Sequence, residues 1–269
     1  MKSKASLTTA ALLAAMAAPS ALTADTIELT GIVRDFKVSH PDMQNPDKDF
    51  GVKQGLVADE LGADGLPVLS EDHYTGRGMI NDAASFSQWY RDTPGVNISI
   101  PYTVVLDNDQ EGPGGVYSVA IEKPNYFFPI DGQGWGDTET DANGNERNFY
   151  FTYELATEFT YTDPETRDLN DNGETGEDAD ALVFKFTGDD DVWVFVNGKL
   201  VVDIGGVHGQ ASDEVNIDDV AEELGLEVGE NYELRFFFAE RHTTESNFRI
   251  ETTLSLVETE PTTVSPLYD

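Results

Sequence analysis

Three consecutive carboxylates, Asp189 to Asp191, stand directly before an apolar run in the stretch GDDDVWVFVNGKLVVDIGG, residues 188–206. Valines and aromatic residues fill every position from 192 to 196, which predicts a strand covered on both faces. Carboxylates this close together raise one another's pKa and cost stability unless a cation offsets their charge. Calcium binds about six to eight oxygens in loose geometry, so adjacent aspartates can share one ion. The run therefore predicts a calcium site; the alternative is that these aspartates only cap and solvate a strand end.

A hairpin is the element that positions this run. Asn197-Gly198, between two apolar runs, is typical of a type I′ turn, in which both central residues need positive φ. A two-residue loop pairs Val192 with Asp203 and brings the acidic run beside Gly205 and Gly206. Because glycine has no side chain, this pair is expected to let backbone oxygens approach an ion closely.

The rest of the chain predicts an all-β fold, an antiparallel β-sandwich or barrel with one or two short helices and a loop-rich N-terminal part. The expected strands are rich in Val, Ile, Thr, Phe and Tyr and are bounded by short Gly, Asn or Asp clusters. They cover residues 27–33, 98–106, 115–122, 148–155, 158–162, 181–187, 192–204, 232–239 and 247–257. Helices are expected at 83–91 and 220–226, the second capped by Asp218 or Asp219 and stopped by Gly225.

Composition and charge limit the classes of partner. The 269 residues carry a formal net charge of −35, which argues against nucleic acid and anionic lipid, because both would be repelled. Residues 1–24 have the basic start, apolar stretch and small-residue end of an export signal, so the mature chain is expected to be secreted, extracellular or periplasmic. No later stretch is long and apolar enough to predict membrane insertion after signal cleavage. Cysteine is absent, so metal ions are one way to stabilise an exported fold without disulfides.

The chain resembles the fibro-slime domain, a relative of the protective-antigen (PA-14) β-sandwich, in several motifs that occur in the same order. The resemblance rests on TGDDDVWVFVNGKLVVDIGGVHG, FFPIDGQGWGD, NFYFTYELATEFTY and FFFAERHTTESNFRIET. We therefore expect a fibro-slime domain over residues 25–258, with a PA-14-like core at about 98–258. A disordered tail is expected at 259–269, where the sequence is rich in Pro and Thr.

In PA-14-type lectins, paired aspartates joined by a cis peptide hold a calcium ion whose open positions bind vicinal sugar hydroxyls. The resemblance places this pair on Asp189 and Asp190 and implies Asn247, in a later loop, as the third ligand. The lectin pattern has Gly after the pair, whereas this chain has Asp191, so the resemblance supports calcium better than carbohydrate. Further candidates for ligand contacts are Asp191, His208, Gln210 and Trp135.

A second acidic segment, DLNDNGETGEDAD, ends at residue 180. It spaces oxygens at Asp168, Asn170 and Asn172, like the first half of a calcium loop. The twelfth position, where such loops carry a bidentate Glu, is Ala179. A surface acidic turn is therefore the preferred interpretation.

These observations predict an exported, non-enzymatic module that binds calcium and engages glycans or extracellular matrix in adhesion. No G-x-S-x-G elbow or phosphate-binding Gly loop occurs in the sequence, and abundant carboxylates do not by themselves indicate hydrolysis. One alternative is a structural matrix or envelope protein in which calcium only stabilises the fold. The other is a secreted glycoside hydrolase or its accessory domain.

Overall fold

A computed structural model of the chain describes residues 26–44, 50–71, 80–109, 115–136, 139–169, 172–176 and 180–259. The expected export signal and nearly all of the expected C-terminal tail lie outside these residues. Among the helices of the described part, none has the length and apolar character that crossing a membrane requires.

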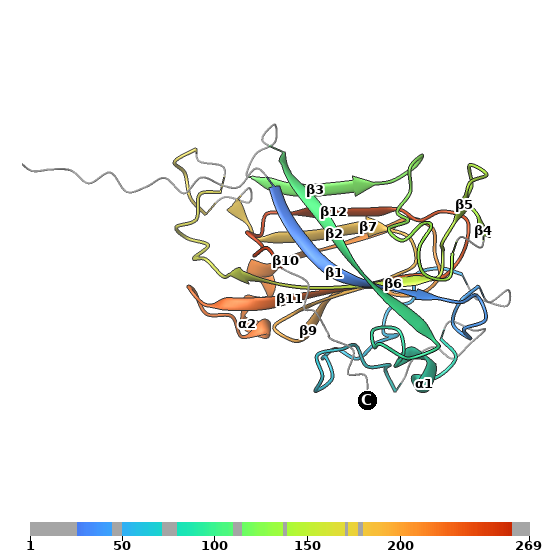
Figure 1. The fold of residues 1–269 in the computed structure, drawn as a ribbon. Coiled ribbons are helices and arrows are strands. Elements are labelled where there is room, and N and C mark those ends of the chain that lie inside the picture. Colours follow the sequence, from blue (N-terminus) through green and yellow to red (C-terminus); the bar gives the residue numbers. More distant parts are fainter. Residues whose placement is uncertain are drawn as a thin grey trace, which may run out of the picture.

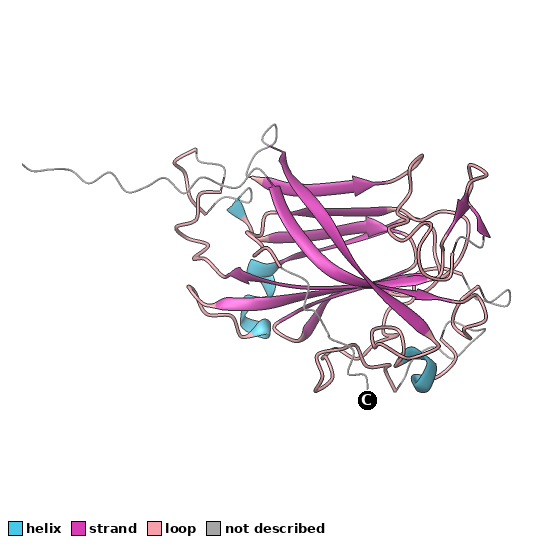
Figure 2. Cartoon of the chain, viewed as in Figure 1, coloured by secondary structure: helices cyan, strands magenta, loops and turns pink. Residues whose placement is uncertain are grey.

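Strands dominate the described residues (Figure 2), and the α-helices there are two short ones, which confirms the all-β fold class. The strands are β1 (Thr26–Phe36), β2 (Asn97–Asp109), β3 (Val116–Ile121), β4 (Glu139–Thr140), β5 (Glu146–Arg147), β6 (Phe151–Thr160), β7 (Val183–Gly188), β8 (Asp191–Val196), β9 (Lys199–Ile204), β10 (Ala211–Asn216), β11 (Asn231–Glu240) and β12 (Phe248–Thr252). The helices are α1 (Ala83–Phe86) and α2 (Ile217–Leu224).

Both helices differ from the expected bounds. Helix α1 is a single turn and is capped by Asp82, so the expected helix to residue 91 is too long. Helix α2 starts earlier than expected because Asn216, whose Oδ1 accepts the Asp218 N–H at 3.0 Å, is the N-cap. Gly225 ends α2 in the left-handed conformation, as expected.

Ten strands form one antiparallel sheet that folds over on itself (Figure 1), in the order β10-β7-β12-β3-β2-β1-β6-β11-β8-β9. In the view of Figure 1, β3, β12 and β7 lie above, β6 and β11 lie below, and β1 and β2 cross diagonally between them. The two ends of the order, β9 and β10, come together through a hydrogen bond of 3.4 Å from Asp203 N–H to Asp213 Oδ2. The sheet is therefore nearly closed, and β4 and β5 form a separate small ribbon.

The N-terminal region belongs to this same sheet. Strand β1 lies between β2 and β6, and it pairs with β2 along its whole length. The loops that follow β1 cover the outer face of β8, where Trp193 packs with Leu56, Trp89 and Tyr90. The opposite face of β8 contributes valines to the main core, so β8 is buried on both faces, as its composition predicted.

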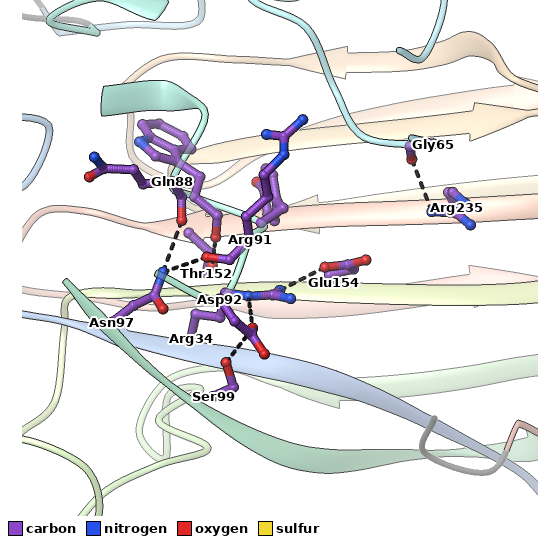
Figure 3. A network of polar contacts seen from close by, with 12 residues as sticks. Arg34, Gly65, Gln88, Arg91, Asp92, Asn97, Ser99, Thr152, Glu154 and Arg235 are labelled. Atoms are coloured by element: carbon purple, nitrogen blue, oxygen red, sulfur yellow. Dashed lines mark hydrogen bonds and ion pairs between the residues drawn. The ribbon is translucent and has the colours of Figure 1, made fainter. Parts of the chain in front are cut away.

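A polar network fixes the loop-rich N-terminal segment to the strands (Figure 3). Arg34 of β1 donates to Asp92 Oδ1 at 2.9 Å and to Glu154 Oε2 at 2.6 Å. Thr152 of β6 donates to the carbonyl of Trp89 at 2.6 Å. These bonds satisfy polar groups that the packing buries, and they hold Trp89 against the sheet.

The Asn197-Gly198 turn is confirmed, with both residues at positive φ, but the hairpin register differs from the expected one. One extra residue in β9 creates a bulge, so Val192 pairs with Ile204 rather than with Asp203. Asp203 lies opposite Trp193 instead, and its Oδ1 accepts the Trp193 indole N–H at 3.0 Å.

Candidate functional site

The candidate site lies where the ends of four strands meet. Strand β7 ends immediately before Asp189, Asp191 opens β8, Glu240 ends β11, and β12 begins directly after Asn247. An open cavity of about 250 Å³ lies at this place. Its lining includes Phe50, Asp189, Asp190, His208, His242 and Glu245.

A buried arginine partly neutralises the acidic run. Arg241 Nε donates to Asp191 Oδ2 at 2.5 Å, and both side chains are fully buried. The backbone N–H of Arg241 donates to Asp190 Oδ2 at 2.7 Å. Strand pairing explains the contact, because Ala239 of β11 lies opposite Asp191 of β8. Asp191 thus binds Arg241 beneath the cavity and does not belong to its lining.

Two further contacts hold the Arg241 guanidinium. Its carbon lies 4.8 Å from the centroid of the Trp89 ring, and Nη1 donates to the carbonyl of Asp42 at 3.3 Å. Burial lowers the pKa of Arg241, but the charges of Asp191 and Asp190 more than offset this and place the pKa above its usual range. Arg241 therefore stays charged as the partner of the acidic run.

Asp189 and Asn247 are in direct contact. The backbone and side-chain N–H groups of Asn247 both donate to Asp189 Oδ2, at 2.8 and 2.6 Å. Asp189 Oδ1 is buried and has no hydrogen-bond partner. Burial raises the pKa of Asp189 to about 6, the Asn247 hydrogen bonds oppose this rise, and the charge of Asp190 adds to it. The amide oxygen of Asn247 accepts the N–H of Lys123 at 3.2 Å.

Asp190 makes the sharp turn into β8 with a left-handed backbone, at φ 49°. The cis peptide bonds among the described residues are Lys123–Pro124 and Thr243–Thr244. The bond between Asp189 and Asp190 is not one of them, so the cis linkage implied by the resemblance is wrong for this structure. The chain bends between β7 and β8 at Asp190, whose φ is positive and whose carboxylate accepts the Arg241 backbone N–H.

Glu240 is a further carboxylate beside the acidic run, and its side chain is fully buried. Burial raises the pKa of Glu240 well above its usual value, and the charges of Asp190 and Asp189 raise it further. Oε1 accepts the His242 N–H at 3.3 Å, whereas Oε2 has no hydrogen-bond partner. Two carboxylate oxygens, Glu240 Oε2 and Asp189 Oδ1, are thus buried without partners close to the cavity, although buried carboxylates are normally paired.

Within the described ranges, no three His, Cys, Asp or Glu side chains are arranged as a complete metal-binding group. Asp189 and Asp190 line the cavity and offer carboxylate oxygens. A cation held by this pair therefore also needs backbone carbonyl, amide or water oxygens. Calcium accepts such mixed oxygen ligands, whereas zinc prefers nitrogen and sulfur.

The other predicted ligand residues divide between the cavity and the surface around it. His208 lines the cavity, but its ring nitrogens face the carbonyls of Gly209 and Ile204 at 2.8 and 3.2 Å. Gln210 donates to Glu122 Oε1 at 2.7 Å and does not belong to the lining. The structure thus brings His208 to the site and directs Gln210 elsewhere.

Trp135 is not part of the cavity lining. Its side chain is 39% exposed, and the Lys37 amino group lies 3.8 Å from the ring centroid. The backbone N–H of Trp135 donates to Asp35 Oδ2 at 2.5 Å, and Asn148 Nδ2 donates to Asp35 Oδ1 at 3.1 Å. Burial raises the pKa of Asp35 to about 6 in spite of both hydrogen bonds.

Gly205 and Gly206 make room for the N-terminal loop rather than for an ion. A Cβ on Gly205 would lie 2.8 Å from the carbonyl of Lys53, and one on Gly206 would lie 2.7 Å from the backbone of the same loop. The close approach allows a hydrogen bond of 2.6 Å from Lys53 N–H to Gly205 O. It also brings Phe50 to the cavity beside His242, with ring centroids 5.3 Å apart.

Glu240, Arg241 and Phe50 were not predicted from the sequence. The sequence does contain a signal for Glu240 and Arg241, because this charged pair directly follows the apolar run FFFA. The acidic run stands in the same way directly before an apolar strand. Phe50 carries no comparable signal, since it lies in a loop-rich segment without hydrophobic periodicity.

Comparison with known proteins supplies a family match. The profile of the PA14 domain matches residues 177–268. Proteins psiQ and psiR of Dictyostelium discoideum are 38% identical to this chain over 242 and 243 residues, respectively. Each match covers 86% of this chain but only 22% and 21% of the relatives, so the chain spans about a fifth of their length.

Two solved structures are similar at low sequence identity. The PA14 sugar-binding domain from an RTX adhesin is 10% identical, with a TM-score of 0.29, over 84% of this chain and 90% of that domain. The PA14 domain of the antifreeze protein MpAFP is 9% identical, with a TM-score of 0.28, over 55% of this chain and 78% of that domain. At these TM-scores the family match depends on the sequence profile.

The substitution Arg241→Met is expected to lower the free energy of unfolding by about 3 to 5 kcal/mol, because it leaves buried carboxylates without their cation. Adding Asp191→Asn to this variant should recover part of the loss, since one of those charges is removed. Urea unfolding in the presence of a chelator measures both effects. Arg249→Met is the matched control, because Arg249 pairs with Glu251 at the surface and should lose less than about 1 kcal/mol. Equal losses at the two positions would contradict the assigned role of Arg241.

Asp35 should make the protein less stable as pH rises through about 6. The pKa of Asp35 in the folded protein lies above the ordinary value of 3.8. The free-energy cost of ionising the buried carboxyl is therefore absent below about pH 4 and complete well above pH 6. We expect the unfolding free energy of Asp35→Asn, minus that of the wild type, to increase by about 2 to 3 kcal/mol between pH 4 and pH 7.5. Urea unfolding across this range measures the difference, in which other titrating groups cancel. A difference independent of pH would show that Asp35 titrates normally.

Proposed function

Because this chain carries a PA14 domain over residues 177–268, we propose that it is a calcium-dependent glycan-binding module that acts in adhesion. The PA14 family is known for sugar binding and adhesion, which supports a carbohydrate-binding role. The calcium part of the proposal rests on one observation, the excess of buried carboxylate charge beside the open cavity.

The excess follows from counting the charged groups. Asp189, Asp190, Asp191 and Glu240 are all buried, and the Arg241 guanidinium pairs with Asp191 while its backbone N–H donates to Asp190. If all four carboxylates are ionised, four negative charges face one positive charge. Such a cluster either takes up protons, as the raised pKa values of Asp189 and Glu240 indicate for the metal-free protein, or binds a cation.

The residues at the cavity suit a hard cation that takes oxygen ligands. Asp189 offers Oδ1, which has no hydrogen-bond partner, and Asp190 offers its carboxylate from the adjacent position. Asn247 is the proposed third ligand. Its side-chain N–H contacts Asp189 and its amide oxygen accepts the Lys123 N–H, so the amide must rotate to present the oxygen to an ion. Calcium, when bound, supplies open coordination positions that vicinal sugar hydroxyls can occupy.

The mouth of the cavity is also suited to a sugar ring. Phe50 is 59% exposed, although it is a large apolar residue, and its ring stands against His242. Aromatic faces pack against the apolar faces of sugars, while the carboxylates and Thr243 offer polar contacts around them. Neutral glycans suit a chain with a net charge of −35. The export signal expected at residues 1–24 supports a role at the cell surface or in extracellular matrix.

Calcium titration tests the metal part of the proposal. Calcium binding at this site should give heat in calorimetry and contribute about 2.7 kcal/mol of stability at a concentration one hundred times the Kd of this site. Asp189→Asn should weaken binding at this site about tenfold or more, yet unfold in chelator no earlier than wild type, since it removes a buried charge. Glu223→Gln, on the exposed face of α2, is the control and should bind like wild type. Wild-type protein that gives neither heat nor stabilisation would refute calcium binding.

A glycan array tests the sugar part separately. With calcium present, the protein should bind at least one class of glycans with vicinal hydroxyls, and chelator or Asp189→Asn should abolish the signal. Phe50→Ala should weaken the glycan signal while leaving calcium binding unchanged, because Phe50 offers no oxygen ligand. Calcium binding together with a blank array would reject the glycan proposal and would leave a structural role for the ion.

A further inference from the structure

The described part of the segment between β6 and β7, residues 161–169, 172–176 and 180–182, lies at the opposite end of β7 from the cavity. Asp189 directly follows the last residue of β7, whereas this segment leads into its first residue, Val183. It lies with α2 at the left of the view in Figure 1, and Arg167 joins it to Asp218 of α2 at 2.8 Å. Any site here is therefore distinct from the cavity.

Asp168 accepts hydrogen bonds from two backbone N–H groups further along the chain. Its Oδ1 accepts the N–H of Asn172 at 3.1 Å, and its Oδ2 accepts the N–H of Gly173 at 2.8 Å. Asn172 Oδ1 in turn accepts the N–H of Glu174 at 2.7 Å. Gly173 has φ 81°, a left-handed backbone conformation that glycine adopts without strain.

Asp180 provides an independent observation. It is only 1% exposed, and its Oδ1 accepts the N–H of Leu169 at 2.8 Å, but its Oδ2 has no hydrogen-bond partner. Because Leu169 directly follows Asp168, this bond brings the Asp180 carboxylate to the start of the turn. A buried carboxylate oxygen without a partner is costly and requires an explanation.

Arg167 is the arginine beside Asp180, but its guanidinium does not bind the Asp180 carboxylate. Its guanidinium binds the carboxylate of Asp218 through Nη1 and Nη2 at 2.8 and 3.1 Å. Toward Asp180 it donates only to the backbone carbonyl, at 2.9 Å. Among the described residues, no Lys or Arg side chain pairs with the Asp168 or Asp180 carboxylate, while Arg167 binds the backbone beside Asp180.

We propose that Asp168 and Asp180 form a second divalent-cation site, which takes calcium through the unpartnered Asp180 Oδ2, Asp168 and amide or carbonyl oxygens of the described residues around them. Carboxylate, amide and carbonyl oxygens are the ligands that calcium prefers. The sequence pattern of this turn lacks the acidic residue that calcium loops carry at the twelfth position, which is Ala179. The structure supplies a carboxylate from the next residue, Asp180, so the missing residue does not argue against a site. This proposal does not depend on the function proposed for the cavity.

The variant Asp180→Asn tests the proposal with little disturbance of the fold. The asparagine oxygen can still accept the Leu169 N–H, and an amide group replaces the charged oxygen that has no partner. We expect wild-type protein to bind two calcium ions per chain in equilibrium dialysis and calorimetry, and Asp180→Asn to bind one. Asp189→Asn should retain the ion at Asp180, and the double variant should bind none. Salt at about 150 mM, where the Debye length is about 8 Å, suppresses diffuse binding to the acidic surface.

Glu165→Gln is the matched control, because it removes one charge from the exposed surface of the same segment and should leave the stoichiometry unchanged. Thermal unfolding in chelator checks that Asp180→Asn is folded, and it should unfold no earlier than wild type. Calcium should then raise the unfolding temperature of Asp180→Asn less than that of wild type. If Asp180→Asn binds as many ions as wild type, the second site is wrong. If wild-type protein binds one ion, and Asp180→Asn but not Asp189→Asn abolishes this binding, the second site is supported and the calcium binding proposed for the cavity is wrong.

Discussion

The buried pair of Arg241 and Asp191 is the interaction on which the candidate site depends. It joins β8 to the residue after β11, and both side chains are inaccessible to solvent. Such a pair is stable only where further contacts satisfy the guanidinium, and here Trp89 and the carbonyl of Asp42 provide them. Both come from the loop-rich N-terminal region, which explains why that region packs on the sheet instead of forming a separate lobe.

One arginine is too little positive charge for the carboxylates around it. The guanidinium of Arg241 pairs with Asp191. Asp189 and Glu240 therefore each keep one buried oxygen that has no hydrogen-bond partner. Low water access strengthens both the repulsion among these carboxylates and their attraction to a cation. The site is thus preorganised for positive charge, at the cost of stability in the protein without a bound ion.

The cavity is assembled from parts of the chain that are far apart in sequence. Phe50 comes from the N-terminal loops, His208 from the loop after β9, and His242 from the loop after β11. Gly205 and Gly206 allow the first two of these loops to lie against each other, because a side chain at either position would collide with backbone. The acidic run contributes carboxylates, whereas the shape of the cavity depends on these loops.

The sequence alone was sufficient for the fold class, the Asn197-Gly198 turn, the double-sided burial of β8 and the position of the acidic run, because these follow from local periodicity and turn chemistry. It did not reveal β10, the bulge in β9 or the short extent of α1, which depend on strand pairing and packing. The charge balance of the site was also decided only in the tertiary structure. The register that places β11 beside β8 determines that Arg241 contacts Asp191 and that other carboxylates keep unpaired oxygens. Local sequence does not show such long-range register.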